Sequence, residues 1–250
     1  MPRSSLKSNK LKIWKRVVLP ILAGLVVAGF FAFANPTLKT SVTAPIQNGL
    51  VGYWNMDSSD IYGFTLYDKS GNGNNGTIYG ATTTTGKIKQ ALSFDGVDDY
   101  VDCGNLGIGG VNTREFWFKP NNLAGSLNQY FLDFGGNNYW VQIYDHDSDG
   151  KLEIRAGAGS TTYVDGIYEF TDTFQWYHVA VTMDSSNILT IYVNGNYDNS
   201  GSKTPGTPGT LSIGRYGGGG YHFNGLIDEV RIYNRALSPA EILQHYNSRS

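Results

Sequence analysis

Two acidic side chains and a loop rich in glycine and asparagine have the chemistry of a calcium site. Asp68 stands just before the loop at residues 72–76, and Asp228 lies far along the chain. Calcium prefers carboxylate, amide and carbonyl oxygens, which a flexible loop can supply. We therefore predict a calcium site made of Asp68, Asn72, Asn74 and Asp228. The alternative is that Asp68 only starts a turn and Asp228 only caps a strand end.

Two further acidic groups favour a structural role. Asp145, Asp147 and Asp149 precede Gly150, as in the first half of an EF-hand loop, but the twelfth position is Ala156 instead of a bidentate Glu. The flanking segments YWVQIY and KLEIR have the pattern of strands, so we expect a solvated hairpin tip. The other group contains the turn signal Asp95-Gly96 and is also expected to be structural: Asp95, Asp98, Asp99 and Asp102.

Aromatic side chains near glycine-rich segments form a second kind of candidate site. Rings that lie flat on a sugar, beside amides and acids that bond its hydroxyls, are typical of glycan recognition. The predicted ligand-binding residues are Tyr139, Trp140, Tyr216, Tyr221 and His222. Tyr163 and Tyr168 offer further rings of the same kind. Because tyrosine and tryptophan also fill sandwich cores, burial of any one of them is the alternative.

The sequence predicts no catalytic residue. His178 lies in a segment with the pattern of a strand, but there is no serine or cysteine elbow to partner it, so we expect a structural histidine. Cys103 is the only cysteine, which excludes an internal disulfide. Its neighbours Val101 and Gly104 predict that it is a small buried residue.

These side chains need a scaffold, and the hydrophobic pattern predicts short strands joined by tight turns. In residues 176–184 every second side chain is apolar, which predicts a strand with one face in the core: Tyr177, Val179, Val181 and Met183. Asn194-Gly195 follows the run LTIYV and predicts a two-residue hairpin turn. The 32 glycines and 17 tyrosines fit many such strands and turns.

The end of the chain predicts one strand followed by one helix. Residues 223–233 form a β-rich run that carries the adjacent acids Asp228 and Glu229, which an ordinary half-buried strand would avoid. The sequence Ser238-Pro239-Ala240-Glu241 is typical of a capped helix start, so we expect a short helix over residues 239–247. Its apolar side chains should pack on the strands: Ile242, Leu243 and Tyr246.

Six segments resemble, in order, the strands and loops of one family. They are GLVGYWNMD at 49–57, DKSGNGNNGT at 68–77, ALSFDGVDDYVDCG at 91–104, WYHVAVTMD at 176–184, LTIYVNG at 189–195 and FNGLIDEVRIYNRALSPAEI at 223–242. Together they resemble LamG-like jelly-roll domains of the concanavalin A-like lectin/glucanase superfamily. The resemblance implies an all-β, concanavalin A-like β-sandwich (jelly roll). The chain departs from the family pattern at NTREFWFKP, residues 112–120, where Arg114 and Glu115 are inserted into a strand that is usually apolar.

The resemblance also bears on the sites. In similar family members, the glycine- and asparagine-rich loop and the acid pair of the last strand often form a structural calcium site, which implies Asp68 and Asp228 as ligands. Laminarinase-type enzymes of this architecture carry Glu, Asp and Glu on alternate residues of one strand. This chain has no such triplet, because Glu229 alternates with Ile227 and Arg231. We therefore expect a binding protein that is not an enzyme.

The N-terminal segment has a different composition. Residues 1–34 hold six of the 19 basic residues and none of the 21 acidic ones, and residues 17–34 carry no charge. As a helix, those uncharged residues would span about 27 Å, close to the thickness of a bilayer core. Ala32-Phe33-Ala34 has the small-x-small form that signal peptidase recognises. Residues 1–34 are thus either a signal peptide or a transmembrane helix that anchors the domain, and both predict an extracytoplasmic domain.

The rest of the chain is acidic, with 13 basic and 21 acidic residues and a formal net charge of −8, which argues against nucleic acid as a partner. We interpret residues 35–48 as a linker and residues 49–250 as one β-sandwich domain. The expected function is the binding of a glycan or surface protein, with calcium as the expected cofactor. The alternatives are a structural domain of a cell or virion surface and, with less support, a glycoside hydrolase.

Overall fold

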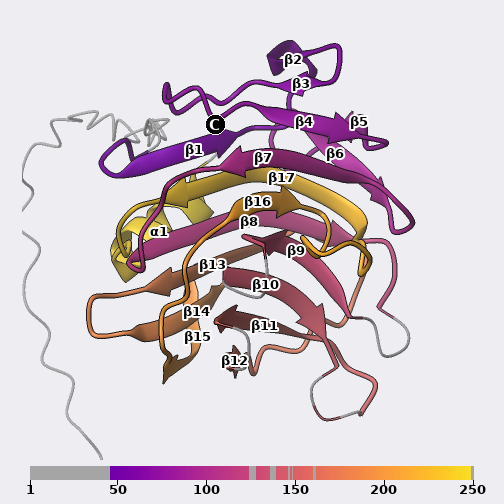
Figure 1. Ribbon diagram of the computed structural model, residues 1–250. Helices are drawn as coiled ribbons and strands as arrows, with labels where there is room; N and C mark the ends of the chain where they lie inside the picture. Colours follow the sequence, from indigo (N-terminus) through magenta and orange to yellow (C-terminus); the bar gives the residue numbers. More distant parts are fainter. Residues whose placement is uncertain are drawn as a thin grey trace, which may run out of the picture. The chain divides into compact units, whose positions relative to one another are not determined.

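The computed structural model describes residues 46–123, 128–135, 139–145, 147, 149–159 and 162–248, which form two stacked β-sheets (Figure 1). The strands of the first sheet follow the order β15 (Asn196–Ser202), β14 (Ile188–Val193), β13 (Tyr177–Met183), β8 (Asn112–Pro120), β17 (Asn224–Tyr233), β6 (Gln90–Asp95) and β5 (Thr82–Thr85). The first strand, β1 (Leu50–Trp54), joins this sheet by pairing with β17.

The strands of the second sheet follow the order β12 (Tyr163–Asp165), β11 (Glu153–Ala158), β10 (Tyr139–Tyr144), β9 (Gln129–Asp133), β16 (Thr210–Ile213), β7 (Tyr100–Asn105), β4 (Gly76–Tyr79), β3 (Thr65–Leu66) and β2 (Ile61–Tyr62). Strand pairing in the described residues is antiparallel throughout. A short 3-10 helix, η1 (Ser58–Asp60), follows β1, and the α-helix α1 (Pro239–Asn247) follows β17. The predicted all-β sandwich, with its first and last strands paired, is confirmed.

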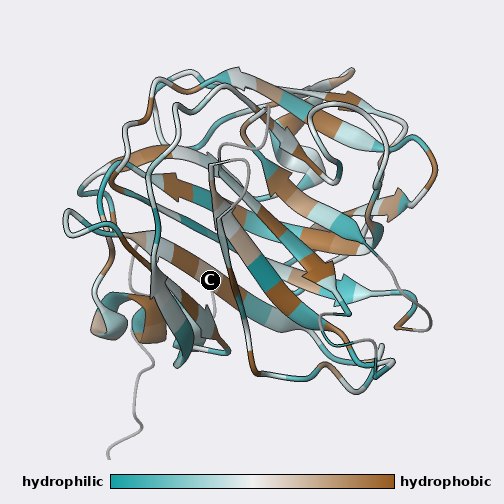
Figure 2. Ribbon diagram, turned by 60° about the horizontal axis from the view of Figure 1, so that its bottom comes forward, coloured by the Kyte–Doolittle hydropathy of each residue, from teal (hydrophilic) through white to brown (hydrophobic). Residues whose placement is uncertain are grey.

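The hydrophobic core lies between the two sheets because apolar side chains alternate along the strands, as the brown and teal bands of Figure 2 show. In β13 the four predicted residues all belong to this core: Tyr177, Val179, Val181 and Met183. Full burial of such a side chain stabilises the fold by roughly 1.5–3 kcal/mol. Cys103 is also buried in the core, and burial raises the pKa of its thiol, which confirms the structural interpretation of this cysteine.

Arg114 and Glu115 lie inside β8 without interrupting it. The Arg114 side chain enters the space between the sheets, where its Nη1 donates to the carbonyl oxygen of Gly157 at 3.3 Å and its guanidinium lies 5.2 Å from the centre of the Tyr139 ring. Burial lowers the pKa of Arg114 to about 10. Glu115 extends from the opposite face of the strand, where its Oε1 lies 2.7 Å from Nδ1 of His245 in α1.

The helix α1 begins as its sequence predicts, and two of its three predicted apolar contacts form. The Ser238 hydroxyl accepts from the backbone N–H of Glu241, and the Glu241 carboxylate accepts from the backbone N–H of Ser238. Ile242 is buried in a small apolar cluster on the outer side of the first sheet, with Leu50, Ala180, Tyr192, Tyr233 and Leu237. Tyr246 stacks on Trp117 of β8 with ring centres 5.6 Å apart, whereas Leu243 stays half-exposed.

The predicted signal peptide or anchor, residues 1–34, lies outside the described residues. In the part of the chain that the structure describes, no helix has the length and apolar character needed to cross a bilayer.

The capping box of α1 predicts a measurable stability change. Ser238→Ala removes the hydroxyl that accepts the Glu241 N–H, and loss of such a cap costs about 1 kcal/mol. We expect urea titrations to give an unfolding free energy lower by about this amount. Ser186→Ala, at an exposed turn between β13 and β14, is the matched control and should leave the free energy unchanged. Equal losses in the two variants would show that the capping box does not stabilise α1.

Candidate functional site

The outer face of the second sheet carries a row of polar and aromatic side chains. Along β10 the inner residues Val141 and Ile143 alternate with the outer residues Trp140 and Gln142. Trp140 stands opposite Asp133 of β9 and Gly157 of β11. Gln142 stands opposite Tyr130 of β9 and Arg155 of β11. Antiparallel pairing therefore brings side chains from three strands to one surface.

Five rings on this face form an aromatic cluster: Tyr130, Trp140, Tyr163, Tyr216 and Tyr221. The Tyr130 ring is its centre, because its ring centre lies 5.7 Å from that of Trp140, 5.2 Å from Tyr216 and 6.0 Å from Tyr221. Trp140 in turn contacts Tyr163 at 6.3 Å between ring centres. Tyr163 is 41% exposed and Tyr221 is 55% exposed, so two of the rings are available to a ligand.

Backbone pairing and a glycine set the geometry of the aromatic cluster. The backbone N–H of Tyr130 donates to the carbonyl oxygen of Tyr221 at 3.0 Å, which ties the segment after β16 to the start of β9. The Trp140 indole lies over Gly157, where an added Cβ would come within 2.2 Å of the indole Cε2 atom. Only glycine at position 157 lets the indole lie flat on the sheet.

Arg155 is held rigidly at the edge of the aromatic cluster. Its guanidinium carbon lies 3.9 Å from the centre of the Tyr144 ring and 4.1 Å from that of the Tyr163 ring. Its Nε also donates to Oδ1 of Asp165 on β12. The stacking of its guanidinium orients the Tyr163 ring. Because Asp165 neutralises its charge, Arg155 does not make this face basic.

Three buried polar atoms on the outer face of the second sheet have no hydrogen-bond partner among the described residues: Oδ1 of Asp133, Nε1 of Trp140 and Oε1 of Gln142. The other oxygen of Asp133, Oδ2, accepts from the backbone N–H of Gly217 at 2.6 Å. Burial raises the pKa of Asp133 to about 6 in spite of this hydrogen bond. Unsatisfied buried polar groups are rare and cost free energy, so their grouping here marks a candidate site. Because these atoms are buried, a ligand reaches them only when the groups that cover them move.

The structure brings three of the five predicted ligand-binding residues together. Trp140, Tyr216 and Tyr221 meet through the ring of Tyr130, which the sequence did not single out, and their role in ligand binding stays a prediction. Tyr139 is a correction: it shares the inner face of β10 with Val141, is fully buried in the core, and is out of reach of a surface ligand. His222 lies beside the cluster, with its Nδ1 3.2 Å from the carbonyl oxygen of Asp99.

The loop of the predicted calcium site is held by hydrogen bonds. Oδ1 of Asp68 accepts from the backbone N–H of Tyr53 at 2.9 Å, and its Oδ2 accepts from that of Asn74 at 3.0 Å. The side-chain amides of Asn72 and Asn74 both donate to the carbonyl oxygen of Val51 in β1. N–H groups thus face the Asp68 carboxylate, which supports its alternative role in ordering a turn; calcium binding by Asp68, Asn72 and Asn74 stays a prediction.

Asp228 lies in the middle of β17, so it does not cap a strand end. The pairing of β17 with β8 shifts by a β-bulge between Asp228 and Arg231, and Glu229 has a φ of 56°. Both acids are buried. Oδ2 of Asp228 accepts from the backbone N–H of Ile88 at 3.0 Å, whereas its Oδ1 has no partner among the described residues. Burial raises the pKa of Asp228 to about 8.

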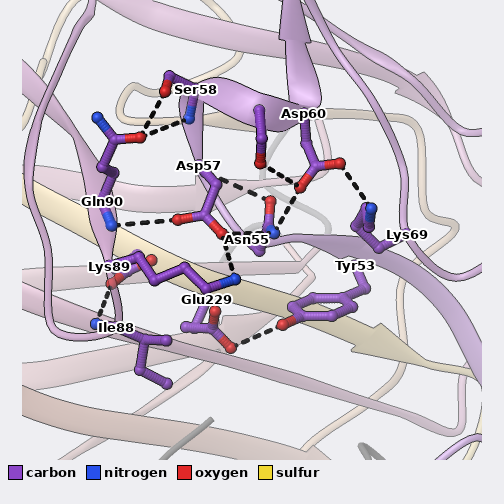
Figure 3. Close-up of polar contacts among 12 residues, drawn as sticks. Tyr53, Asn55, Asp57, Ser58, Asp60, Lys69, Ile88, Lys89, Gln90 and Glu229 are labelled. Atoms are coloured by element: carbon purple, nitrogen blue, oxygen red, sulfur yellow. Dashed lines mark hydrogen bonds and ion pairs between the residues drawn. The ribbon is translucent and has the colours of Figure 1, made fainter.

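A polar network surrounds this acid pair (Figure 3). Oε2 of Glu229 accepts from the Tyr53 hydroxyl at 2.9 Å. Nearby, the buried carboxylate of Asp57 accepts from the backbone N–H of Gln90 at 3.1 Å and from Nζ of Lys89 at 3.2 Å. The network therefore connects the end of β1 to the start of β6.

Apart from Asp102, which lies in β7, the remaining acidic groups lie at turns. Oδ1 of Asp95 accepts from the backbone N–H of Val97 in the turn between β6 and β7. Between β10 and β11, Oδ2 of Asp145 accepts from the backbone N–H of Gly150, and Asp149 pairs with Lys151 at 3.2 Å. His178, the histidine of β13, is buried beneath α1 beside Glu115, which fits a structural role.

Residues 95–243, more than half of the chain, match the family described as the concanavalin A-like lectin/glucanases superfamily. The chain belongs to this superfamily. The match begins at the turn between β6 and β7 and ends in α1, so it includes the aromatic cluster and the acids of β17.

Solved structures share the fold of this superfamily member. Domain 4 of AbnA, a GH43 extracellular arabinanase from Geobacillus stearothermophilus, is 24% identical, with a TM-score of 0.63 over 78% of this chain and 97% of that domain. The binding domain of Paraclostridial Mosquitocidal Protein 1 is 19% identical, with a TM-score of 0.63 over 81% of this chain and 52% of the other. The botulinum neurotoxin serotype D binding domain is 15% identical, with a TM-score of 0.61 over 80% and 52%. This chain spans about half of the toxin domains, and these likenesses establish the fold alone.

Burial of Asp133 makes the unfolding free energy of this superfamily member depend on pH, and one substitution isolates that contribution. A carboxyl whose pKa is raised from 3.8 to about 6 by folding stabilises the protein below pH ~4, and that contribution is lost as the pH rises through about 6. Asp133→Asn keeps an oxygen for the Gly217 N–H but cannot ionise. As the pH is raised from about 4 to about 6, we expect the unfolding free energy of the variant minus that of the wild type to increase, by at most about 1.4 kcal/mol per pH unit. Urea titrations in chelator measure this difference, and a difference independent of pH would contradict the burial of a titrating Asp133.

Proposed function

We propose that this chain is an extracytoplasmic glycan-binding module whose ligand lies on the outer face of the second sheet. The observation that carries this proposal is the aromatic cluster with its three buried, unpartnered polar atoms. Exposed rings such as Tyr163 and Tyr221 can stack on the apolar face of a sugar. The three buried atoms of the same face offer one carboxylate oxygen, one amide oxygen and one indole N–H, which suit sugar hydroxyls once a movement exposes them.

Charge supports a ligand that is not a polyanion. Arg155, the basic group within the cluster, is paired with Asp165, and Asp133 adds an acid to the same face. The chain beyond residue 34 has a formal net charge of −8. Phosphate backbones require a basic surface, so nucleic acid does not fit this face. The export signal predicted in residues 1–34 favours a ligand outside the cytoplasm.

Structural neighbours supply examples of such ligands. Domain 4 of the arabinanase was solved in complex with arabinotriose. The binding domain of botulinum neurotoxin DC was solved in complex with SialylT and, separately, with rat synaptotagmin II. These complexes support a glycan as the ligand of this fold, and they keep a surface protein as the second candidate partner.

We propose binding without hydrolysis. A glycosidase needs two carboxyl groups that flank the scissile bond, one of them free to donate a proton. Near the aromatic cluster, Asp133 has one oxygen bonded to the Gly217 N–H, and Asp165 is bonded to Arg155. Neither carboxyl is placed as a member of such a pair. Release of reducing sugars from a bound polysaccharide would overturn this part of the proposal.

Two exposed rings test the glycan site. Tyr163→Ala and Tyr221→Ala should each weaken binding of a glycan selected on an array about tenfold, because a lost stacking contact is worth about 1.4 kcal/mol. Phe174→Ala removes a ring that is 86% exposed on the loop before β13 and is not one of the five rings of the cluster, and it is the matched control. Isothermal titration of the full chain measures the dissociation constants.

The site assignment requires that the control keep wild-type affinity. Equal weakening in all three variants would mean that binding is not localised to the aromatic cluster. Failure of the wild-type chain to bind any glycan on the array would contradict the proposed function and favour the structural alternative.

We further propose calcium as a structural ion at Asp228. The fit rests on its buried Oδ1, which has no partner among the described residues and would remain ionised beside a cation. Bound there, calcium would lie next to the polar network of Figure 3, while Oδ2 of Asp228 keeps its hydrogen bond from the backbone N–H of Ile88.

Chelation tests the ion. An ion that binds only the folded state at a hundredfold excess over its dissociation constant stabilises by about 2.7 kcal/mol, so chelator should lower the melting temperature of wild-type protein. Asp228→Asn should abolish most of that sensitivity, whereas Asp147→Asn at the exposed hairpin tip should retain it. A wild-type melting curve that chelator leaves unmoved would show that Asp228 binds no calcium.

A further inference from the structure

A second aromatic surface lies at the other end of the same sheet face. Phe64 and Tyr79 line a hollow of about 510 Å³ together with Thr77, Asp98 and Tyr100. Phe64 is 76% exposed at the turn between β2 and β3, and Tyr79 is 45% exposed on β4. Rings so exposed beside a hydroxyl and a carboxylate have the composition of a sugar-binding subsite.

The Tyr79 ring is held in a rigid stack. It lies nearly parallel to Tyr100, with ring centres 4.4 Å apart and an angle of 9° between the planes. The Arg215 guanidinium lies 3.3 Å from the centre of the same Tyr100 ring. Because Tyr79 and Arg215 both stack on Tyr100 this closely, they must occupy its opposite faces. Tyr79 is thus a preorganised platform that loses little entropy when a ligand stacks on it.

The hollow and the aromatic cluster are joined through adjacent residues. Arg215 stacks on Tyr100 of the hollow, whereas the next residue, Tyr216, contacts Tyr130 of the cluster. Strand pairing also links the two ends, since Ser212 stands opposite Asp102 on one side and Asp133 on the other, although Ser212 and Asp133 are themselves buried. From β4 to β10 the face crosses four strand spacings, or about 19 Å. Figure 1 shows these strands following one another across the sheet.

We propose that the hollow is a second sugar-binding subsite and that the ligand is a linear polysaccharide lying across the strands from the hollow to the aromatic cluster. This inference rests on the proposed glycan function and specifies it. A single terminal sugar could occupy one end only, whereas a chain of several sugars meets rings at both ends. Simultaneous occupation of both ends raises affinity without new contacts at either.

The test compares short and long ligands on the full chain. The probes are arabinan, β-glucan and galactan, each as trisaccharide and octasaccharide, measured by isothermal titration. At least one octasaccharide should bind tenfold or more tightly than its trisaccharide. Tyr79→Ala and Phe64→Ala should remove that gain while leaving the trisaccharide affinity unchanged, because the trisaccharide binds at the aromatic cluster.

Two further variants keep the result interpretable. Tyr79→Phe retains the ring and should retain the gain with length, which separates loss of the platform from misfolding. Phe174→Ala should bind both ligands as the wild type does. Equal affinity for trisaccharide and octasaccharide, or a gain that survives Tyr79→Ala, would overturn the second subsite. If Tyr163→Ala weakens binding in that case, the proposed glycan function stands; if no probe binds the wild type, both proposals fall.

Discussion

The pairing of the last strand, β17, is the constraint on which the rest of the structure depends. One edge of β17 pairs with β8, while its other edge pairs first with β6 and then with β1. Asp228 and Glu229 lie at the point along β17 where its partner on this edge changes from β6 to β1. A bulge there places a non-glycine residue in the left-handed region, at a cost of about 1–2 kcal/mol. The hydrogen bonds from Ile88 and Tyr53 to these two acids offset that cost and hold three segments of the chain together.

This arrangement determines which face of the sandwich is open. The first sheet has α1 against its outer side, where Tyr246 stacks on Trp117 and Glu115 contacts both His245 and Arg231. These charged groups are buried and serve the attachment of the helix. In the described part of the chain, the second sheet carries no helix on its outer side. Exposed rings lie at both ends of this sheet, from Phe64 at one end to Tyr163 at the other, and a ligand on its outer face would meet them.

Features set by local patterns could be predicted from the sequence. The alternation in β13, the Asn194-Gly195 turn and the capping box at Ser238 each depend on neighbouring residues, and all three are confirmed. The alternation of side chains along a strand also predicts the inner position of Tyr139, because it alternates with Trp140 and shares its face with Val141. Alternation does not predict the cluster around Tyr130, since Tyr216 and Tyr221 reach it from a segment about 90 residues away. The bulge at Glu229 likewise depends on which strands pair with β17.

The most direct measurement is an NMR titration that follows the tryptophan indole N–H signals of nitrogen-labelled protein. Nε1 of Trp140 has no hydrogen-bond partner among the described residues, whereas Nε1 of Trp54 donates to the carbonyl oxygen of Asn74 at 3.0 Å. A glycan identified on the array should shift the Trp140 signal saturably, with the midpoint that calorimetry gives, and leave the Trp54 signal in place. Trp140→Phe assigns the signal. Saturated binding with an unmoved Trp140 signal would contradict the assignment of the ligand to the outer face of the second sheet.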